Sequence, residues 1–328
     1  MSAQIPQKFG SMPRRLRLGI VGGGAGLIGE VHANGARLSN RWELFAGALS
    51  SNAERAKAAG KAWFLAADRC YESYQEMARA EAQRADGIDA VAIVTPNHLH
   101  APVALEFMAR GIDVISDKPV TARLDELGPL VAAQEKSKVF FGVTYAYASH
   151  PMLRQAREMV RAGELGELRQ IHVEYFQDWA IDLTDQAGDI PWRLDPAQTG
   201  SSFTVADIGT HAEHLACFAS GLQIEALRAD FHVTGAAKPL EDTAFMQLRF
   251  EGGGDAVVIE DSPALQLGVD QDFTLEVRIR TQVTPDVAII GNKDWNTGLN
   301  PGFVFSFEYP NGPGWKVNIG DGNERADA

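Results

Sequence analysis

An aspartate and two histidines lie close enough in the sequence to carry acid–base chemistry together. Asp207 lies four residues before His211, and His214 follows three residues later. If Asp207 begins a helix, side chains at this spacing project from one face. A carboxylate beside an imidazole orients the ring and supports its protonated form. We expect His211 to be the general base for a hydroxyl, Asp207 its orienter and a substrate anchor, and His214 a substrate contact. The alternative is a capping aspartate beside core histidines.

A glycine-rich segment near the start of the chain predicts a dinucleotide site. Residues 22–29 read GGGAGLIG and come directly after a short apolar run. Glycines let the backbone turn tightly and approach a pyrophosphate, and a following helix offers free N–H groups and its positive dipole end. Gly24, Gly26 and Gly29 fit the known spacing, while an overlapping interpretation uses Gly22 and Gly24 for the turn. The alternative is a simple glycine-rich connection.

Apolar runs and helical segments alternate over residues 16–145. The expected strands are 16–21, 42–49, 90–94, 113–116 and 139–143. The expected helices are 30–39, 52–66, 102–110 and 124–136. This alternation predicts an α/β fold with a Rossmann-type, doubly wound parallel sheet, in which ligands bind at the carboxyl ends of the strands.

The residues after the second expected strand bear on the choice of cofactor. An NAD-selective site usually has an acidic residue here for the ribose 2′-OH, and this chain has none. It has Ser50, Ser51 and Asn52 instead, with Arg55 nearby. The hydroxyls of Ser50 and Ser51, together with Arg55, could accept a 2′-phosphate, which favours NADP over NAD. Alternatively, the polar residues only cap a helix and Arg55 is solvated.

Three further motifs complete a family pattern. They are Thr95-Pro96-Asn97-His98-Leu99-His100, Asp117-Lys118-Pro119 and Asp207-Ile208-Gly209-Thr210-His211. With the glycine segment, and in this order, they make residues 16–250 resemble the Gfo/Idh/MocA oxidoreductases. Those are NAD(P)-dependent sugar and inositol dehydrogenases with a Rossmann domain and an open-sheet α/β second domain. The resemblance implies that Pro96, Asn97 and His100 line the nicotinamide and its ribose, and that Thr95, Asp117 and Lys118 also bind the cofactor. For the first of these motifs, the alternative is a turn with a helix cap.

Lys118 is the catalytic lysine that the resemblance implies. The family pattern is Glu-Lys-Pro, so Asp117 keeps the acid but is one methylene shorter. Pro119 fixes the turn, and we expect a cis bond before it. A lysine at a strand end, largely removed from water, can donate to or accept from a hydroxyl that is being oxidised. The alternative for a lone lysine is a solvated surface charge.

Residues 146–252 are expected to form the substrate domain. Tyr147, Trp192 and Arg193 are candidate substrate contacts, because Trp and Arg suit stacking on and hydrogen bonding to a polyol. Ala146 and Ala148 stand where the family often has Asn and Arg, which removes two polar groups from the expected substrate wall. The resemblance implies hydride transfer between NAD(P) and a secondary alcohol of a sugar, inositol or glycoside. A sensor that binds dinucleotide and sugar without turnover is the alternative.

The rest of the chain divides into an open-sheet domain and a β-rich tail. In residues 146–252 we expect a helix at 152–162 and strands at 170–177, 224–233 and 242–250. Beyond residue 252 the resemblance stops, and the expected strands are 255–260, 272–281, 286–290, 303–309 and 314–319. This all-β tail, 253–328, resembles half of a LamG-like, concanavalin-type jelly roll, which suggests a carbohydrate-binding role. The α+β open-sheet domain is then incomplete, through a natural fusion, a truncation or an artificial junction near residues 248–253.

Composition limits the class of partner. The 328 residues predict about two domains, and the net charge of −13 argues against nucleic acid or an anionic membrane surface as the main partner. The sequence contains no run of about 18 apolar residues, so we expect no membrane-spanning helix. Cys70 and Cys217 are too few for a disulfide framework. We therefore expect a cytoplasmic protein with a flexible N-terminus (1–15) and no metal. A homo-oligomer can form through the open sheet of the second domain.

Overall fold

The computed structural model describes most of the chain. It covers residues 14–24, 26–168, 170–180, 191–234 and 237–251, and the backbone of strands at 257–261, 287–291, 302–308, 314–320 and 325–327. The chain forms two compact units, residues 1–266 and 267–328. The strand expected at 272–281 and almost all of the N-terminus expected to be flexible lie outside the described residues.

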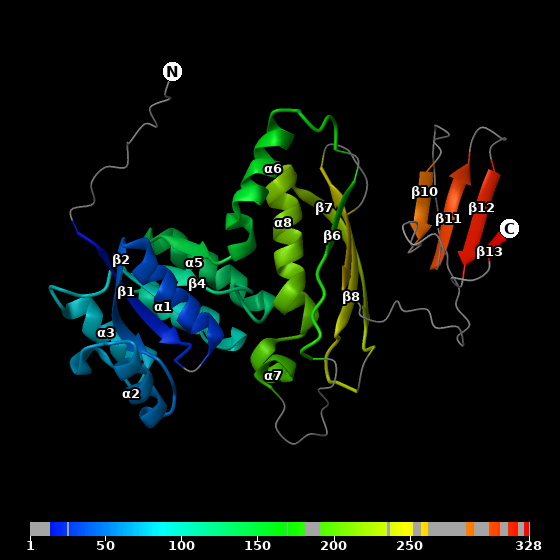
Figure 1. The fold of residues 1–328 in the computed structure, drawn as a ribbon. Coiled ribbons are helices and arrows are strands. Elements are labelled where there is room, and N and C mark those ends of the chain that lie inside the picture. Colours follow the sequence, from blue (N-terminus) through cyan, green and yellow to red (C-terminus); the bar gives the residue numbers. More distant parts are fainter. Residues whose placement is uncertain are drawn as a thin grey trace. The chain divides into compact units, whose positions relative to one another are not determined.

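The first sheet is parallel and has five strands in the order β2-β1-β3-β4-β5 (Figure 1). Its strands are β1 (Leu16–Gly22), β2 (Trp42–Ala48), β3 (Ala90–Val94), β4 (Asp113–Ser116) and β5 (Phe141–Val143). After β2 at one edge, the chain crosses to β3 at the centre of the sheet. The strands β4 and β5 then follow toward the other edge, which is the winding of a doubly wound fold. The prediction of a Rossmann-type sheet is therefore confirmed.

Helices cover both faces of this sheet. They are α1 (Leu27–Ser39), α2 (Ala53–Ala62), α3 (Tyr74–Gln83), α4 (His100–Met108) and α5 (Leu127–Ser137). One buried cluster joins Ala33 of α1 and Ala59 of α2 to Ile20. The other cluster joins Phe107 of α4 to Val21, the next residue of β1. Successive side chains of the strand therefore pack into hydrophobic cores on opposite faces of the sheet.

The helix α3 was not expected from the sequence. Its N-terminus is capped by Ser73, whose hydroxyl accepts a hydrogen bond from the N–H of Glu76. The buried face of the helix carries Glu81, and a charge at a core position hides the apolar pattern of an amphipathic helix. Glu81 is tolerated there because Arg69 donates to it at 2.8 Å and the Tyr71 hydroxyl donates at 2.6 Å.

The second sheet has the strand order β6-β9-β8-β7 and lies beside a helical layer (Figure 1). Its strands are β6 (Ile171–Glu174), β7 (Ile224–His232), β8 (Thr243–Phe250) and β9 (Val257–Asp261), and its helices are α6 (Pro151–Arg161), α7 (Pro196–Thr199) and α8 (Thr210–Ser220). Ala212 and Ala216 of α8 pack against Met246 and Leu248 of β8. Small residues on the helix let it approach the larger side chains of the sheet.

The strand β9 corrects the expected extent of the second domain. From the sequence, this domain is expected to end at residue 252, and the strand at 255–260 is expected in the tail. In the structure β9 pairs in parallel with β6 and antiparallel with β8, so it lies inside the second sheet. It thereby covers an edge that each of these strands would otherwise expose.

In the described part of the unit 267–328, four short strands form an antiparallel sheet. They are β10 (Val287–Gly291), β11 (Gly302–Glu308), β12 (Gly314–Gly320) and β13 (Arg325–Asp327), hydrogen-bonded in that order. The strands expected at 286–290, 303–309 and 314–319 are therefore present. The resemblance of this part to a LamG-like domain stays a prediction. None of the helices in the described ranges is long and apolar enough to cross a membrane.

Candidate active site

The glycine segment forms a tight turn between β1 and α1. Gly22 and Gly23 have φ angles of +82° and +72°, a region that favours glycine. A Cβ on Gly29 would lie 2.1 Å from the backbone oxygen of Gly23, so the first turn of α1 packs directly on the loop. Gly26 precedes the helix and provides no side-chain cap. The N-terminal N–H groups of α1 are thus left for a ligand such as a pyrophosphate.

Replacing Gly29 by alanine should weaken dinucleotide binding by about tenfold or more. The new methyl group would collide with the backbone of the loop and push it out of its shape. Gly35 lies in the same helix with nothing within 4 Å of an added Cβ, so Gly35→Ala is the matched control. Titration of NAD(H) and NADP(H) into both variants checks this. Equal affinities of Gly29→Ala and the wild type would show that the loop does not hold the dinucleotide.

The end of β3 adds a polar group beside this turn. The Thr95 hydroxyl is buried and has no hydrogen-bond partner in the described part of the chain. A Cβ on Gly22 would lie 2.9 Å from Cγ2 of the same threonine, so the two segments are in contact. A buried hydroxyl without a hydrogen-bond partner destabilises the folded protein unless a bound ligand supplies that partner. The glycine turn and Thr95 therefore fit a bound dinucleotide.

The residues expected to select the cofactor cap the helix α2. Asn52 accepts from the N–H of Arg55 at 3.0 Å, and the Ser50 hydroxyl accepts from the N–H of Asn52 at 3.1 Å. The capping alternative is therefore realised for Asn52, and the Ser50 hydroxyl holds the turn just before the helix. Arg55 is exposed, and its guanidinium forms no hydrogen bond or ion pair with another described residue. It stays available for an anion such as a 2′-phosphate.

The other residues of the motif at 95–100 are mostly engaged within the protein. His100 is 1% exposed, and its Nδ1 and Nε2 lie 2.6 and 2.9 Å from the backbone oxygens of Pro119 and Thr95. Asn97 is also buried and donates to Thr199 of the second domain. Pro96 precedes the short 3-10 helix that begins at Asn97. Thr95 thus carries the buried side-chain group of this motif that lacks a hydrogen-bond partner in the described part of the chain.

The Asp117-Lys118-Pro119 turn follows β4 and contains the expected cis bond before Pro119. The Asp117 carboxylate accepts from the N–H of Lys118 at 2.8 Å and from the Thr144 hydroxyl at 2.9 Å. These contacts tie the turn to the end of β5. The shortened acid therefore holds the turn that carries Lys118.

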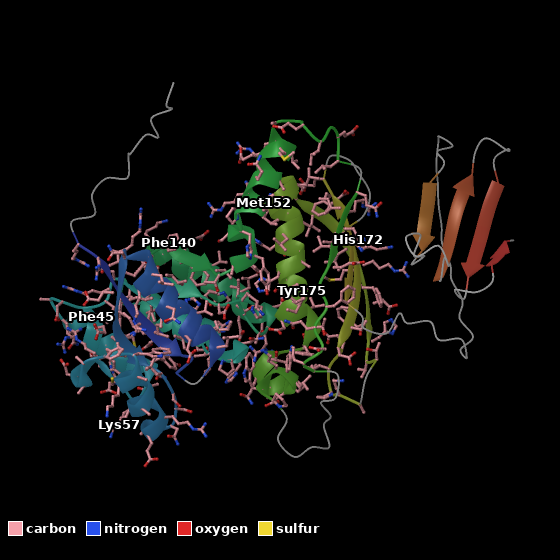
Figure 2. All side chains as sticks on the ribbon, viewed as in Figure 1. Phe45, Lys57, Phe140, Met152, His172 and Tyr175 are labelled. Carbon is pink, nitrogen blue, oxygen red and sulfur yellow. The ribbon has the colours of Figure 1, made fainter. Side chains whose placement is uncertain are left out.

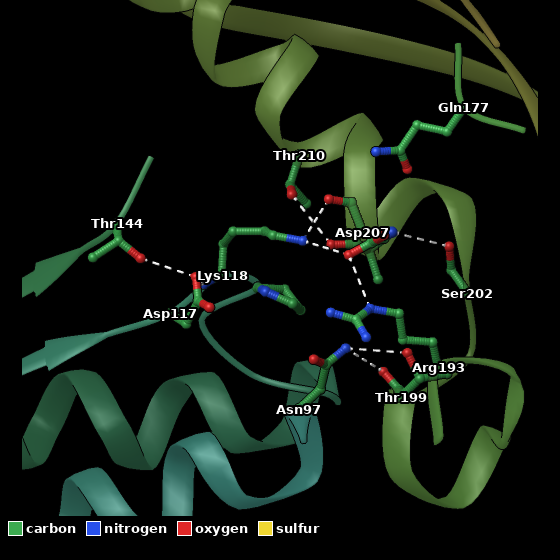
Figure 3. Close-up of polar contacts among 12 residues, drawn as sticks. Asn97, Asp117, Lys118, Thr144, Gln177, Arg193, Thr199, Ser202, Asp207 and Thr210 are labelled. Carbon is green, nitrogen blue, oxygen red and sulfur yellow. Dashed lines mark hydrogen bonds and ion pairs between the residues drawn. The ribbon is translucent and has the colours of Figure 1, made fainter. Parts of the chain in front are cut away.

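The side chain of Lys118 reaches the second domain (Figure 3). Its Nζ donates to Oδ1 of Asp207 at 2.8 Å and also to the backbone oxygen of Asp207. Arg193 approaches the same carboxylate, with Nε 3.6 Å from Oδ1. The Lys118 and Asp207 side chains are only 12% and 20% exposed. Asp207 thus lies between two cations, and Lys118 retains one N–H for another acceptor.

Asp207 does not begin a regular helix, contrary to expectation. It lies in a π-helical turn (Val205–Gly209) that continues directly into α8. Such turns are rare and are often found at functional sites. The sequence pattern does not indicate one, because helical spacing alone predicts an ordinary helix start.

His211 lies close to this pair but differs from expectation in charge. Burial and the nearby Lys118 ammonium lower the pKa of His211 to about 4, although Asp117 and Asp207 act in the opposite direction. The ring is therefore neutral near pH 7, whereas the adjacent carboxylate was expected to support the protonated form. A neutral imidazole can accept a proton, which is what a base for a hydroxyl requires.

Aromatic side chains surround the two histidines of α8. The ring centroids of Tyr147 and His211 are 4.5 Å apart, and Tyr145 stacks on His214 at 4.1 Å. Burial lowers the pKa of His214, and its Nδ1 is buried without a partner in the described part of the chain. The predicted contacts Tyr147 and His214 are thus brought together with His211.

Tyr175 was not anticipated as a site residue. Its hydroxyl lies 2.8 Å from that of Tyr147, and burial together with this contact raises the pKa of Tyr147 to about 12. Alternation along β6 places Ile171, Val173 and then Tyr175 on the side of α8, with His172 on the opposite side (Figure 2). The same alternation was visible in the sequence and could have identified Tyr175.

The guanidinium of Arg193 lies over two tryptophan rings. It lies 4.5 Å from the ring centre of Trp192 and 6.0 Å from that of Trp179. Trp192 and Arg193 belong to a short 3-10 helix (Trp192–Leu194). The predicted pair is therefore at the site, with Arg193 directed to Asp207 (Figure 3).

Both domains match models of a single protein family. Residues 16–145 match an oxidoreductase family with an NAD-binding Rossmann fold, and residues 153–273 match the GFO/IDH/MocA C-terminal domain. The second match passes residue 252 and includes β9. This agrees with the pairing of β9 inside the second sheet.

Individual proteins show the same relationship. The uncharacterized oxidoreductase YfiI of Bacillus subtilis is 35% identical over 73% of this chain and 62% of its own length. D-xylose 1-dehydrogenase (NADP(+)) 2 of Haloferax volcanii is 34% identical over 51% of this chain and 47% of its own. The chain thus spans less than two thirds of these curated relatives. A crystal structure of an oxidoreductase from Sinorhizobium meliloti is 35% identical, with a TM-score of 0.67 over 96% of this chain and 77% of that one. The chain belongs to the GFO/IDH/MocA oxidoreductase family.

Proposed function

We propose that this chain is an NAD(P)-dependent dehydrogenase that oxidises a secondary alcohol of a sugar, inositol or glycoside. The observation that carries the proposal is the contact of Lys118 with Asp207 beside a neutral His211, at the carboxyl end of the Rossmann sheet. The name of the relative D-xylose 1-dehydrogenase (NADP(+)) 2 supports a sugar as substrate.

In the proposed reaction His211 accepts the proton of the substrate hydroxyl at a ring nitrogen. Lys118 directs its remaining N–H to the same oxygen and stabilises the negative charge that develops there. Asp207 fixes the position of Lys118, and Arg193 helps to hold the carboxylate. When bound, the dinucleotide supplies a nicotinamide ring that accepts the hydride.

The surrounding side chains suit a polyol. Tyr147 and Tyr175 present paired hydroxyls, and Trp179 and Trp192 offer flat apolar surfaces beside Arg193. A sugar has C–H faces that stack on such rings and hydroxyls that bond to the polar groups. The exchange of two expected polar residues for Ala146 and Ala148 leaves these aromatic groups as the main contacts.

A panel of sugars, inositols and glycosides, each tested with NAD⁺ and NADP⁺, examines the proposal. We expect reduced nicotinamide to accumulate with at least one alcohol, and not with the same alcohol lacking the reactive hydroxyl. Tight dinucleotide and sugar binding without any turnover across the panel would contradict the enzyme and support the sensor alternative.

Arg55 provides a test of cofactor choice. Replacing Arg55 by alanine should weaken NADP binding by about 10- to 100-fold and leave NAD binding nearly unchanged, because a charged hydrogen bond to the 2′-phosphate would be lost. Arg79 is an exposed arginine on α3, so Arg79→Ala is a matched control. Isothermal titration with both dinucleotides measures the effects. Equal weakening of NAD and NADP would refute a phosphate role for Arg55.

A further inference from the structure

Asn97 connects the two domains. Its Nδ2 donates to the backbone oxygen of Thr199 at 2.9 Å and to the hydroxyl of Thr199 at 3.2 Å (Figure 3). Asn97 follows β3 of the Rossmann sheet, whereas Thr199 ends α7 in the second domain. The two residues are 4% and 3% exposed. The amide is therefore used inside the protein, although its motif predicted a contact with the cofactor.

The segment around Thr199 has a defined local structure. Asp195 caps α7, accepting from the N–H of Ala197 at 2.9 Å and from the side chain of Gln198 at 2.8 Å. The backbone oxygen of Gln198 also lies 3.2 Å from Nδ1 of His98. Neighbouring residues of the 95–100 motif thus contact consecutive residues of α7. The segment 195–200 is docked as a unit rather than by a single bond.

Gly200 brings the same segment against the turn that carries Lys118. Its φ of +101° favours glycine, and an added Cβ would lie 2.4 Å from the backbone oxygen of Ala122. Ala122 follows the cis Lys118-Pro119 bond by three residues. Segment 195–200 therefore fits between the chain after β3 and the chain after β4.

We propose that Asn97, Thr199 and Gly200 form an interdomain latch that sets Asp207 against Lys118. Asp207 comes seven residues after Gly200. The latch therefore fixes the beginning of the short segment that leads into the π-helical turn with Asp207. Asn97 is then a positioning residue for the Lys118–Asp207 pair and not a ligand of the dinucleotide. The kinetic part of this proposal rests on the dehydrogenase function, and the structural part does not.

Two variants and one control test the latch. Asn97→Asp keeps the size of the side chain but replaces the amide NH₂ group by an oxygen. That oxygen would face the backbone oxygen of Thr199, and neither can donate a hydrogen bond to the other. Gly200→Ala introduces the collision with Ala122. Gly163→Ala is the matched control, because Gly163 has φ +73° but nothing within 4 Å of an added Cβ. Dinucleotide affinity, kcat, KM and amide hydrogen exchange of residues 195–209 are measured for each.

We expect both latch variants to exchange faster at residues 195–209 and to lose about tenfold or more in kcat, while dinucleotide affinity stays within about twofold of the wild type. Gly163→Ala should match the wild type in all of these. If Asn97→Asp instead weakens dinucleotide binding about tenfold with unchanged exchange, Asn97 is a cofactor ligand and the latch is refuted. Gly200→Ala behaving like Gly163→Ala would refute it as well. Exchange needs no turnover, so it decides the latch even if the dehydrogenase proposal fails.

Discussion

Replacing Lys118 by alanine should lower kcat by about 10³-fold, the scale expected for losing a positioned acid–base group. The substitution removes the N–H that faces the reacting oxygen and one of the two cations beside Asp207. Dinucleotide affinity should change little, because the glycine turn and Thr95 are left in place. Steady-state kinetics with the alcohol that gives the highest wild-type turnover measures the effect.

The exposed Lys136 on α5 provides the control for charge removal. Lys136→Ala should leave kcat and KM at wild-type values, and circular dichroism should show that both variants are folded. If kcat of Lys118→Ala stays within about threefold of the wild type, Lys118 does not act on the reacting oxygen and the mechanism is wrong.

Replacing His211 by asparagine should lower kcat by about 10²-fold, because the neutral ring that accepts the proton is lost. The pKa of His211 near 4 means that this group adds no pH dependence to the rate near neutrality. For the wild type, kcat/KM should fall as the pH drops toward 4, and this fall should be absent in His211→Asn. The exposed His172 on the other side of β6 provides the control variant His172→Asn.

The same pKa predicts how stability depends on pH. The folded state lowers the pKa of His211 from 6.5 to about 4, so the unfolded chain binds more protons between these two values. The free energy of unfolding should therefore decrease as the pH falls through this window, and His211→Asn should decrease less than the wild type. Urea unfolding at about pH 7.5 and about pH 5 measures the difference. Equal decreases in both proteins would contradict a depressed pKa.

Local features of the first domain could be predicted from the sequence. The β-branched and alanine-rich runs define the strands, and the glycine spacing defines the turn to α1, because each depends on neighbouring residues only. The helix α3 was missed because Glu81 occupies a core position. Its burial depends on Arg69 and Tyr71, which lie outside the helix, and such pairing is invisible to periodicity.

Some properties of the site residues could likewise be predicted from the sequence, and others could not. Lys118, Asp207 and His211 come from motifs, and the structure brings them together. The charge of the histidine could not be predicted, because it depends on the sum of burial, an ammonium and two carboxylates. The contact of Asn97 with a residue 102 positions away depends on how the domains pack.

Transfer of deuterium tests the central claim most directly. The alcohol found in the substrate panel is prepared with deuterium at the carbinol carbon and incubated with the protein and its preferred dinucleotide. We expect the label to be recovered in the reduced dinucleotide from wild-type protein, and Lys118→Ala to slow its appearance. Label that remains on the substrate carbon or passes to water while product forms would contradict hydride transfer at this site.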